Sequence, residues 1–337
     1  MQRYLNISAR DRVLQKTPVS FDEPDQHRDT GYLVSLIQEQ QVTVVRFVPS
    51  MLQAFLDERD VSSCRSLRHV VCSGEVLPPG LRDNTLRLLP ARLHNLYGPT
   101  EAAIDVTAWE CTDVGGVVPI GRPVCGVRCV VVDRYGGVAP AGVVGELVVG
   151  GVGLARGYVG RSGLTAQRFV AGVGGGRWYR TGDLVRWDTD GALRFVGRVD
   201  RQVKVRGVRV EPGEVEVVLV SHPRVRECVV VAGAVGLVAY LVPAGSSVPV
   251  EAVRRFVRGV LPEVLVPAVF EVVDGLPVTG TGKVDRRRLA AVSVRVGTGG
   301  VGPRTPTERV VAGVWAAVLG RPPGGVGGSA LVVGADR

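Results

Sequence analysis

The feature that most constrains the fold is an alternation of helical and extended patterns between residues 31 and 92. Residues 32–37 have the apolar spacing of an amphipathic helix, and residues 42–48 form a buried extended run that a proline ends. A second helical pattern at residues 51–56 precedes the next extended run, at residues 67–72. Strands that alternate with helices are joined by crossovers, and such crossovers produce a parallel sheet. This part of the chain is therefore predicted to have an α/β fold.

The pattern changes twice more along the chain. After Ile104, short valine-rich strands alternate with glycine turns, which favours a β-rich subdomain. Near Asp200 a third region begins, where mixed extended and helical patterns predict a smaller α+β domain. Its expected elements are a strand at 202–208, a helix beginning at 211–216, strands at 228–232 and 238–242, a helix at 250–261 and a strand at 269–273. A run rich in glycine and valine at residues 292–303 is typical of a linker.

Charge and composition exclude several classes of function. The 337 residues carry a formal charge of +9, but the basic residues are scattered without a basic, aromatic-interleaved face, which disfavours nucleic-acid binding. An anionic small ligand such as a nucleotide explains part of the excess. Irregular spacing of the cysteines and histidines disfavours a zinc site, and Cys72, in an apolar run, is expected to be a reduced, buried thiol. Without a signal core or an apolar span of about 18 residues, a cytoplasmic location away from membranes is expected.

A glycine-flanked lysine, Lys283, lies in the run 279–289 and leads into a basic segment. Alone, this pattern is more typical of a solvated hairpin than of an anion-binding loop. Three motifs precede it: Tyr-Gly-Pro-Thr-Glu at residues 97–101, Tyr-Arg-Thr-Gly-Asp-Leu at residues 179–184, and an arginine- and valine-rich run at residues 197–207. Together, in this order, the four motifs closely resemble the later core motifs of nonribosomal peptide synthetase adenylation domains, which belong to the acyl-adenylate-forming superfamily.

The resemblance implies an amino-acid adenylating, AMP-forming ligase. It implies a partial acyl-adenylate-forming large domain at residues 1–199, with a parallel α/β sheet and a β-rich subdomain, and a small α+β C-terminal domain at residues 200–291. A linker at residues 292–304 and the truncated start of a peptidyl-carrier domain at residues 305–337 would follow. The expected ligands are an amino acid, ATP, Mg²⁺ and a carrier's phosphopantetheine. The expected partners are the carrier and condensation domains of a synthetase.

The first of these motifs supplies an aromatic face, a hydroxyl and a carboxylate. The resemblance assigns adenine stacking to Tyr97, phosphate hydrogen bonding to Thr100 and Mg²⁺ coordination to Glu101, which suits their chemistry. A plain β-turn with an exposed glutamate is the alternative for these residues in isolation. We also count Gly74 and Glu75 among the nucleotide-binding residues.

The later motifs supply further nucleotide contacts and a hinge. By resemblance, Asp183 accepts hydrogen bonds from the ribose hydroxyls, although a turn cap is its alternative role. Arg198 resembles a ribose or phosphate contact, and Asp200 matches the hinge about which the small domain swings between half-reactions. Lys204 matches a lysine associated with the thioester-forming orientation, or is an exposed strand lysine. Lys283 is expected to neutralise charge at the carboxylate and α-phosphate as the acyl-adenylate forms.

An amino-acid pocket is also implied by the resemblance. Asp22 matches the aspartate that clamps the substrate α-ammonium by a charge-assisted bond. The other pocket positions that align are Arg46, Val71, Ser73, Leu96, Ile104, Asp105 and Lys283. The series is similar to that of serine-activating members, because Ser73 and Asp105 suit a short hydroxyl side chain. Arg46 departs from the usual histidine and is expected to crowd or recharge the pocket.

The resemblance has three breaks. The family's Ser/Thr/Gly-rich phosphate loop does not precede Asp22, and the helix and strand that the family has between Asp22 and His27 are lacking. Near the C-terminus, Ser329 sits in a run similar to a phosphopantetheine attachment site that is one residue short, so a frayed tail is the preferred interpretation. A fragment with impaired activity is therefore expected. An inactive nucleotide-binding or docking remnant and an acyl- or aryl-CoA ligase are the alternatives.

Overall fold

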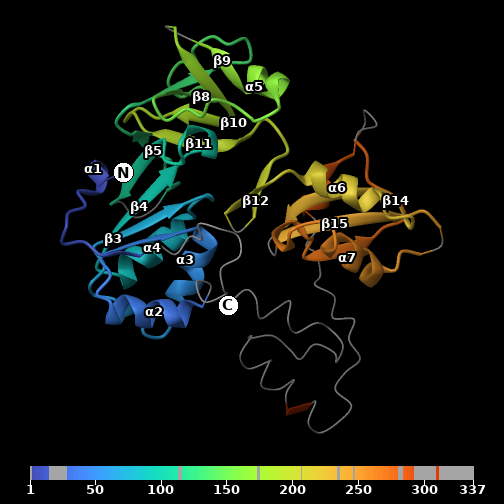
Figure 1. Ribbon diagram of the computed structural model, residues 1–337, viewed down its shortest axis with the longest axis horizontal. Coiled ribbons are helices and arrows are strands. Elements are labelled where there is room, and N and C mark those ends of the chain that lie inside the picture. Colours follow the sequence, from blue (N-terminus) through green and yellow to red (C-terminus); the bar gives the residue numbers. More distant parts are fainter. Residues whose placement is uncertain are drawn as a thin grey trace. The chain divides into compact units, whose positions relative to one another are not determined.

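A computed structural model describes residues 2–14, 29–112, 116–172, 175–205, 207–233, 236–245, 247–279, 284–291 and 309–310. The chain divides into two compact units, Met1–Arg209 and Val210–Arg337 (Figure 1). The expected boundary at residues 199 and 200 stays a prediction. So do the linker at 292–304 and the carrier start at 305–337, which lie almost entirely outside the described residues.

The first unit contains a six-stranded sheet in the order β1-β2-β3-β4-β5-β6. Its strands are β1 (Val13–Leu14), β2 (Val44–Phe47), β3 (His69–Ser73), β4 (Arg92–Tyr97), β5 (Thr107–Cys111) and β6 (Arg122–Pro123). Strands β1 to β4 are parallel, while β5 and β6 pair antiparallel at one edge. The predicted α/β class with a parallel sheet is confirmed.

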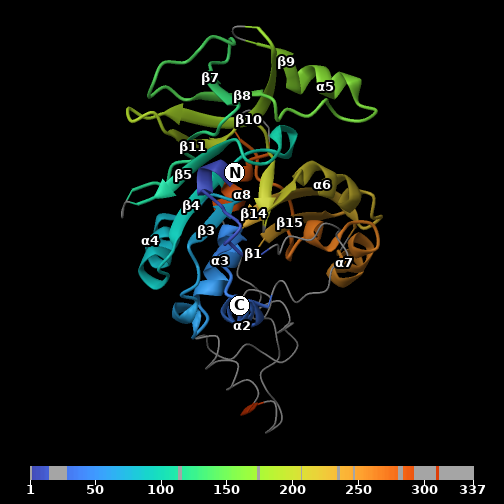
Figure 2. The same cartoon turned by 60° about the vertical axis from the view of Figure 1, so that its left-hand side comes forward.

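The helices that precede or connect the strands of this sheet begin where local chemistry favours them. They are α1 (Gln2–Leu5), α2 (Thr30–Glu39), α3 (Pro49–Leu56) and α4 (Pro79–Leu88), with 3₁₀ turns η2 (Val61–Ser63) and η3 (Thr100–Ala102). At the start of α2, the Asp29 side chain accepts a hydrogen bond from the Tyr32 amide at 3.0 Å, a standard N-cap. Pro49 ends β2 and also occupies the first turn of α3, where its missing N–H costs nothing. Helices α2, α3 and α4 lie beside β2–β4 in both views (Figures 1 and 2).

The two faces of this sheet bury different groups. On one face, apolar side chains of α2, α3 and α4 pack with alternate strand residues such as Val45, Phe47 and Val70 around a single core. The opposite face carries a smaller apolar cluster that includes Val71 and Leu96. Because side chains alternate along a strand, two of the predicted pocket residues therefore share this second face.

A buried histidine pair on the same face makes the unit sensitive to acid. Nδ1 of His69 lies 3.0 Å from Nε2 of His94, and both rings are buried. Burial first, and then the charges of His69 and Arg92, lower the pKa of His94 from 6.5 to about 4. The folded state therefore binds this proton less readily than the unfolded chain, so stability falls as the pH drops from 6.5 towards 4, by at most about 3 kcal/mol.

We expect His94→Gln, which keeps a polar group near His69, to flatten this dependence. Urea unfolding at pH 8, 6 and 5 measures it. A wild-type slope retained in the variant would assign the acid sensitivity to other groups.

The rest of the first unit is an antiparallel sheet in the order β11-β10-β8-β7, with β9 paired to β10. Its elements are β7 (Val127–Val132), β8 (Gly145–Gly151), α5 (Ser162–Arg168), β9 (Phe169–Ala171), β10 (Arg177–Trp187) and β11 (Leu193–Arg198). An apolar core beneath it includes Val131, Leu147 and Val185 and extends to Tyr97 at the end of β4. The expected β-rich subdomain is thus observed, and its core reaches the first predicted motif.

One expected strand is instead a hairpin. The run predicted as a single strand at 202–208 forms β12 (Val203–Val205) and β13 (Val208–Val210), which pair with each other. Gly207 lies in the intervening turn with φ of +78°, and a Cβ there would come within 2.5 Å of Val48. Alternating valines predict extended backbone but cannot locate a turn, which here depends on a glycine in the left-handed region.

The second unit has a three-stranded sheet, β14-β15-β16, in which β15 and β16 are parallel. Its elements are α6 (Pro212–Val220), β14 (Val225–Gly233), β15 (Gly236–Pro243), α7 (Val250–Arg258), η4 (Glu263–Leu265), β16 (Val269–Val272) and α8 (Arg286–Ala291). Arg286 of α8 pairs with Glu216 of α6 at 2.6 Å. The predicted small α+β domain is observed. Within the described residues, no helix combines the length and apolarity needed to cross a bilayer.

Candidate active site

Three residues from separate motifs meet in one buried cluster. The Tyr97 hydroxyl, at the end of β4, donates a hydrogen bond of 2.5 Å to Asp183 on β10. Arg198, at the end of β11, donates to the other oxygen of the same carboxylate. Asp183 and Arg198 are direct cross-strand partners, so the antiparallel register of β10 and β11 brings them together. Burial, and then the Asp183 charge, raise the pKa of Tyr97 well above its usual range, so its hydroxyl stays protonated.

The predicted hinge residue is held by two arginines. Asp200 accepts hydrogen bonds from Nε of Arg198 at 2.6 Å and from Nη2 of Arg168 at 3.2 Å. Burial alone would raise the pKa of Asp200, but its hydrogen bonds and its attraction to Arg198 outweigh burial and lower the pKa. Asp200 is therefore ionised at neutral pH. It forms ion pairs with Arg198 at the end of β11 and with Arg168, and the hinge role expected from the sequence did not predict these pairs.

Glu101 lies in a cage of polar side chains. It is the middle residue of η3, and its carboxylate accepts a hydrogen bond of 2.7 Å from Tyr158. Nη1 of Arg209 lies 3.0 Å from both carboxylate oxygens. Burial acts to raise the pKa of Glu101, but the Tyr158 hydrogen bond and the Arg209 charge outweigh it, so the pKa is lowered. Thr100, the first residue of η3, is exposed and close in sequence to this carboxylate.

The remaining predicted nucleotide residues contact the β12–β13 hairpin. Glu75 accepts hydrogen bonds from the Gly207 amide at 2.6 Å and from the Ser50 amide at 3.2 Å. Gly74 has φ of +95°, which favours glycine, and a Cβ there would lie 3.2 Å from Val48 Cγ1 and, as an ordinary contact, 3.6 Å from the Gly207 Cα. The Lys204 ammonium lies 5.9 Å from the centroid of the Tyr97 ring, within cation–π range. The aromatic face predicted to stack on adenine is thus next to a lysine in this structure.

Three polar residues of the predicted amino-acid pocket that the structure describes form one bonded group. Arg46 donates from Nε to Ser73 at 2.9 Å and from Nη2 to Asp105 at 2.9 Å. Its Nη1 also lies 3.3 Å from Asp105. Ser73 and Asp105 were expected to bond a substrate hydroxyl, but here both are already bonded to Arg46. Arg46 thus places a positive charge next to Asp105, and its effect on the pocket stays a prediction.

The apolar members of this pocket differ in exposure. Val71 and Leu96 are buried on the second face of the sheet, whereas Ile104 is 53% exposed. Ala103 and Ile104 have φ of +57° and +72°, which is unusual for a β-branched residue such as isoleucine. This strained turn immediately precedes Asp105, whose carboxylate contacts Arg46.

Three predicted functional residues, Asp22, Lys283 and Ser329, lie outside the described residues. For the lysine loop, only the base is described. Val278 and Val284 form an antiparallel bridge on either side of it, and the Asp285 amide donates to the Pro277 carbonyl at 2.7 Å.

Sequence reasoning missed Arg209, Tyr158 and Arg168 as parts of the site. Each binds a predicted residue through a contact distant in sequence: the Arg209–Glu101 pair spans 108 positions and the Tyr158–Glu101 pair spans 57. For Arg209, a local signal was available in the sequence, because it is a charged residue within the valine-rich run at residues 203–210. In the described part of the chain, no three His, Cys, Asp or Glu side chains gather in a metal-binding group.

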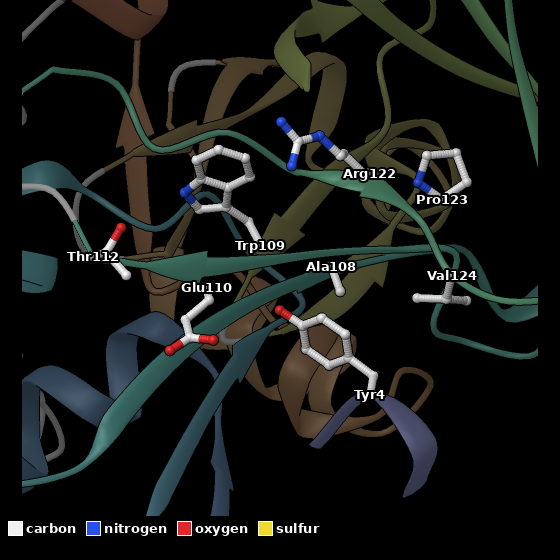
Figure 3. Close-up of a pocket in the computed structure, with 8 residues that line it drawn as sticks. All are labelled: Tyr4, Ala108, Trp109, Glu110, Thr112, Arg122, Pro123 and Val124. Atoms are coloured by element: carbon white, nitrogen blue, oxygen red, sulfur yellow. The ribbon is translucent and has the colours of Figure 1, made fainter. Parts of the chain in front are cut away.

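A separate cavity of about 530 Å³ lies along β5 and β6 (Figure 3). Its lining residues are Tyr4, Ala108, Trp109, Glu110, Thr112, Arg122, Pro123 and Val124. None of the predicted site residues is among them. The Arg122 guanidinium already lies over the Trp109 ring, 5.5 Å from its centroid. We therefore locate the candidate site by the bonded motif residues and not by this cavity.

The fold and site define the class of protein. Residues 16–159 match the family described as AMP-binding enzyme, and residues 214–283 match the AMP-binding enzyme C-terminal domain. The chain belongs to this family of AMP-binding enzymes.

More particularly, the chain is similar to peptide synthetases. Phosphinothricin tripeptide synthetase PhsB of Streptomyces viridochromogenes is 46% identical over 94% of this chain and 29% of its own length. Zwittermicin A synthase ZmaJ of Bacillus cereus is 39% identical over 86% of this chain and 62% of its own length. The solved structure of holo-PA1221, an NRPS protein containing adenylation and PCP domains, has a TM-score of 0.71 at 29% identity, and the match covers 88% of this chain and 51% of that one. The predicted resemblance to nonribosomal peptide synthetase adenylation domains is confirmed, and the chain spans only part of each of these relatives.

Proposed function

We propose that this chain activates an amino acid with ATP, forming an aminoacyl-adenylate that is transferred to a phosphopantetheine carrier in nonribosomal peptide synthesis. Family membership supports the proposal. The observation that carries it is the bonded cluster of Tyr97, Asp183 and Arg198. Tyr97 and Asp183 are 86 positions apart, yet their side chains are 2.5 Å apart. Motif residues from separate strands form one polar cluster. This arrangement favours a shared ligand-binding role over the alternative in which each motif is only a turn.

The proposed reaction needs no nucleophile from the protein. A carboxylate oxygen of the amino acid attacks the α-phosphorus of ATP, and the bond from that phosphorus to the pyrophosphate oxygen breaks. The products are the aminoacyl-adenylate and pyrophosphate. A carrier thiol then attacks the acyl carbon, the thioester forms, and AMP leaves. Lys283 is proposed to neutralise the charge that builds at the α-phosphate during the first step.

The described residues are assigned nucleotide contacts in this proposal. Tyr97 is assigned to adenine, Asp183 to the ribose hydroxyls, Arg198 to the ribose or a phosphate, and Thr100 to a phosphate. Gly74 and Glu75 are also assigned to nucleotide binding.

Glu101 fits Mg²⁺, because this ion takes one or two carboxylates together with phosphate oxygens. The same carboxylate already binds one cation, the Arg209 guanidinium. When bound, the metal would supply positive charge against the departing pyrophosphate.

We propose serine as the favoured substrate. Although both are bonded to Arg46, the Ser73 hydroxyl can still donate and the Asp105 carboxylate can still accept, beside the apolar Val71 and Leu96. Asp22 is assigned to the substrate ammonium. Arg46 balances the charge of Asp105, which leaves a polar site without excess negative charge. We further propose that activity is impaired, because Lys204 and Arg209 lie on groups assigned to adenine and Mg²⁺. The proposed partners are carrier and condensation domains.

Amino-acid-dependent exchange of pyrophosphate into ATP tests this function. The purified chain is assayed with each proteinogenic amino acid, and Lys283→Ala serves as the control. We expect exchange with serine, reduced roughly a hundredfold or more in the variant. Exchange with a different amino acid would reject serine alone. Activation of acids that lack an amine would favour a CoA ligase, and no exchange with any substrate would favour an inactive remnant.

A further inference from the structure

The β12–β13 hairpin contacts three of the groups that the proposed function assigns to the nucleotide. Glu75 bonds the Gly207 amide at 2.6 Å, and Lys204 lies over the Tyr97 ring. Arg209 pairs with Glu101 at 3.0 Å. Lys204 and Arg209 both bring positive charge to groups that a metal–nucleotide complex would also need.

Arg209 binds the carboxylate that the proposed function assigns to the metal. Its Nη1 lies 3.0 Å from both carboxylate oxygens, so each oxygen of Glu101 already has a cationic partner in this structure. The pair is largely shielded, with 12% of the Glu101 side chain and 30% of the Arg209 side chain exposed. In such a setting, a guanidinium and a divalent cation on one carboxylate repel each other strongly.

The arginine is itself held in place from its own segment. Nε of Arg209 donates to Gln202, at the other end of the hairpin. On the opposite side, Tyr158 donates to Glu101 at 2.7 Å and orients the carboxylate. The contact therefore joins two pre-oriented groups, unlike a flexible surface ion pair.

We propose that Arg209 is an internal cation that competes with the metal–nucleotide complex for Glu101, so that the docked β12–β13 hairpin blocks nucleotide entry. This inference rests on the proposed function. Lys204 adds a second positive charge, 5.9 Å from the centroid of the Tyr97 ring. Nucleotide binding then requires release of the hairpin, and any factor that holds the hairpin docked lowers the apparent affinity for nucleotide.

Equilibrium binding of Mg·ATP to the full chain tests the competition, with a fluorescent ATP analogue as the probe. Arg209→Gln removes the charge and should bind roughly tenfold more tightly than the wild type. Arg209→Lys keeps a cation and should stay within about threefold of the wild type. Arg92→Gln, in the same unit, removes an exposed arginine 3.8 Å from Glu110 and is the matched control, with no change expected. In a Glu101→Gln background, Arg209→Gln should give no further gain.

Hydrogen exchange supplies a readout that does not depend on the variants. Mg·ATP should accelerate exchange in residues 203–209 of the wild type, including the Gly207 amide that Glu75 protects. Equal affinity of Arg209→Gln and wild type, or no binding by either, overturns the proposal, as does hairpin exchange that Mg·ATP leaves unchanged.

The two proposals fail separately. Tighter Mg·ATP binding by Arg209→Gln without amino-acid-dependent exchange upholds the competition and rejects the enzyme activity. Amino-acid-dependent exchange, together with no effect of Arg209→Gln on Mg·ATP binding, upholds the enzyme activity and rejects the competition.

Discussion

Replacing Arg198 with alanine is expected to destabilise the first unit by about 3–5 kcal/mol, because it leaves the buried Asp183 carboxylate without its cation. Only 14% of the Arg198 side chain and 9% of that of Asp183 are exposed, so solvent screens the pair weakly. Arg198 also holds Asp200 at 2.6 Å, and that ion pair is lost together with the first. Urea unfolding at pH 7, followed by the fluorescence of Trp178 and Trp187 on β10, measures the change.

The matched control for this change is Arg186→Ala, on the neighbouring strand β10. Arg186 is 46% exposed and lies 3.9 Å from Asp188, so its loss should cost no more than about 1 kcal/mol. Equal costs for the two variants would mean that the Asp183 cluster contributes no more than an exposed pair. Nucleotide binding should be lost in Arg198→Ala even at temperatures where the protein stays folded.

Replacing Gly98 with alanine is expected to cost about 3 kcal/mol or more and to distort the turn that carries Tyr97 and Glu101. A Cβ at this position would lie 2.1 Å from the carbonyl oxygen of Ile104 and 2.8 Å from the Val106 amide nitrogen. Both neighbours are backbone atoms, and the Val106 amide also donates to the Tyr97 carbonyl at 2.8 Å. No rotation of a side chain relieves the overlap, so the loop must move.

Gly80→Ala is the control for this second prediction. Gly80 lies in the first turn of α4, and no atom comes within 4 Å of a Cβ placed there. Its replacement should change stability by no more than about 0.5 kcal/mol. Thermal unfolding of both variants gives the comparison. A Gly98→Ala protein as stable as the Gly80→Ala protein would show that the 98–106 loop is free to adjust.

Most elements of the fold follow from local pattern. The helical spacing of residues 32–37 became α2, the extended run at 42–48 became β2, and the runs at 228–232 and 238–242 became β14 and β15. The exception was the run at 202–208, where a turn at Gly207 divides one expected strand into two. Side-chain period identifies extended backbone, but whether it continues straight or reverses depends on what packs against it.

The sequence predicted several residues of the candidate site, but not the hydrogen bonds and ion pairs that join them. The motifs gave Tyr97, Glu101 and Asp183, because their residue types and order resemble a family. They did not give the Arg46 contacts to Ser73 and Asp105, the latter 59 positions away. They also did not give the contact of Arg209 with Glu101.

By itself, then, the sequence determined the order of helices and strands, the family, and the residue types available for nucleotide chemistry, because these depend on spacing and on short motifs. Only the tertiary structure decided which charges neutralise one another. Arg46 on β2 reaches Ser73 because β2 pairs with β3, and it also reaches Asp105, which directly follows the strained residue Ile104. Arg209 reaches Glu101 because Gly207 turns the chain back against Glu75. An ion pair is set by distance in space, and sequence separation carries almost no information about that distance for side chains on different elements.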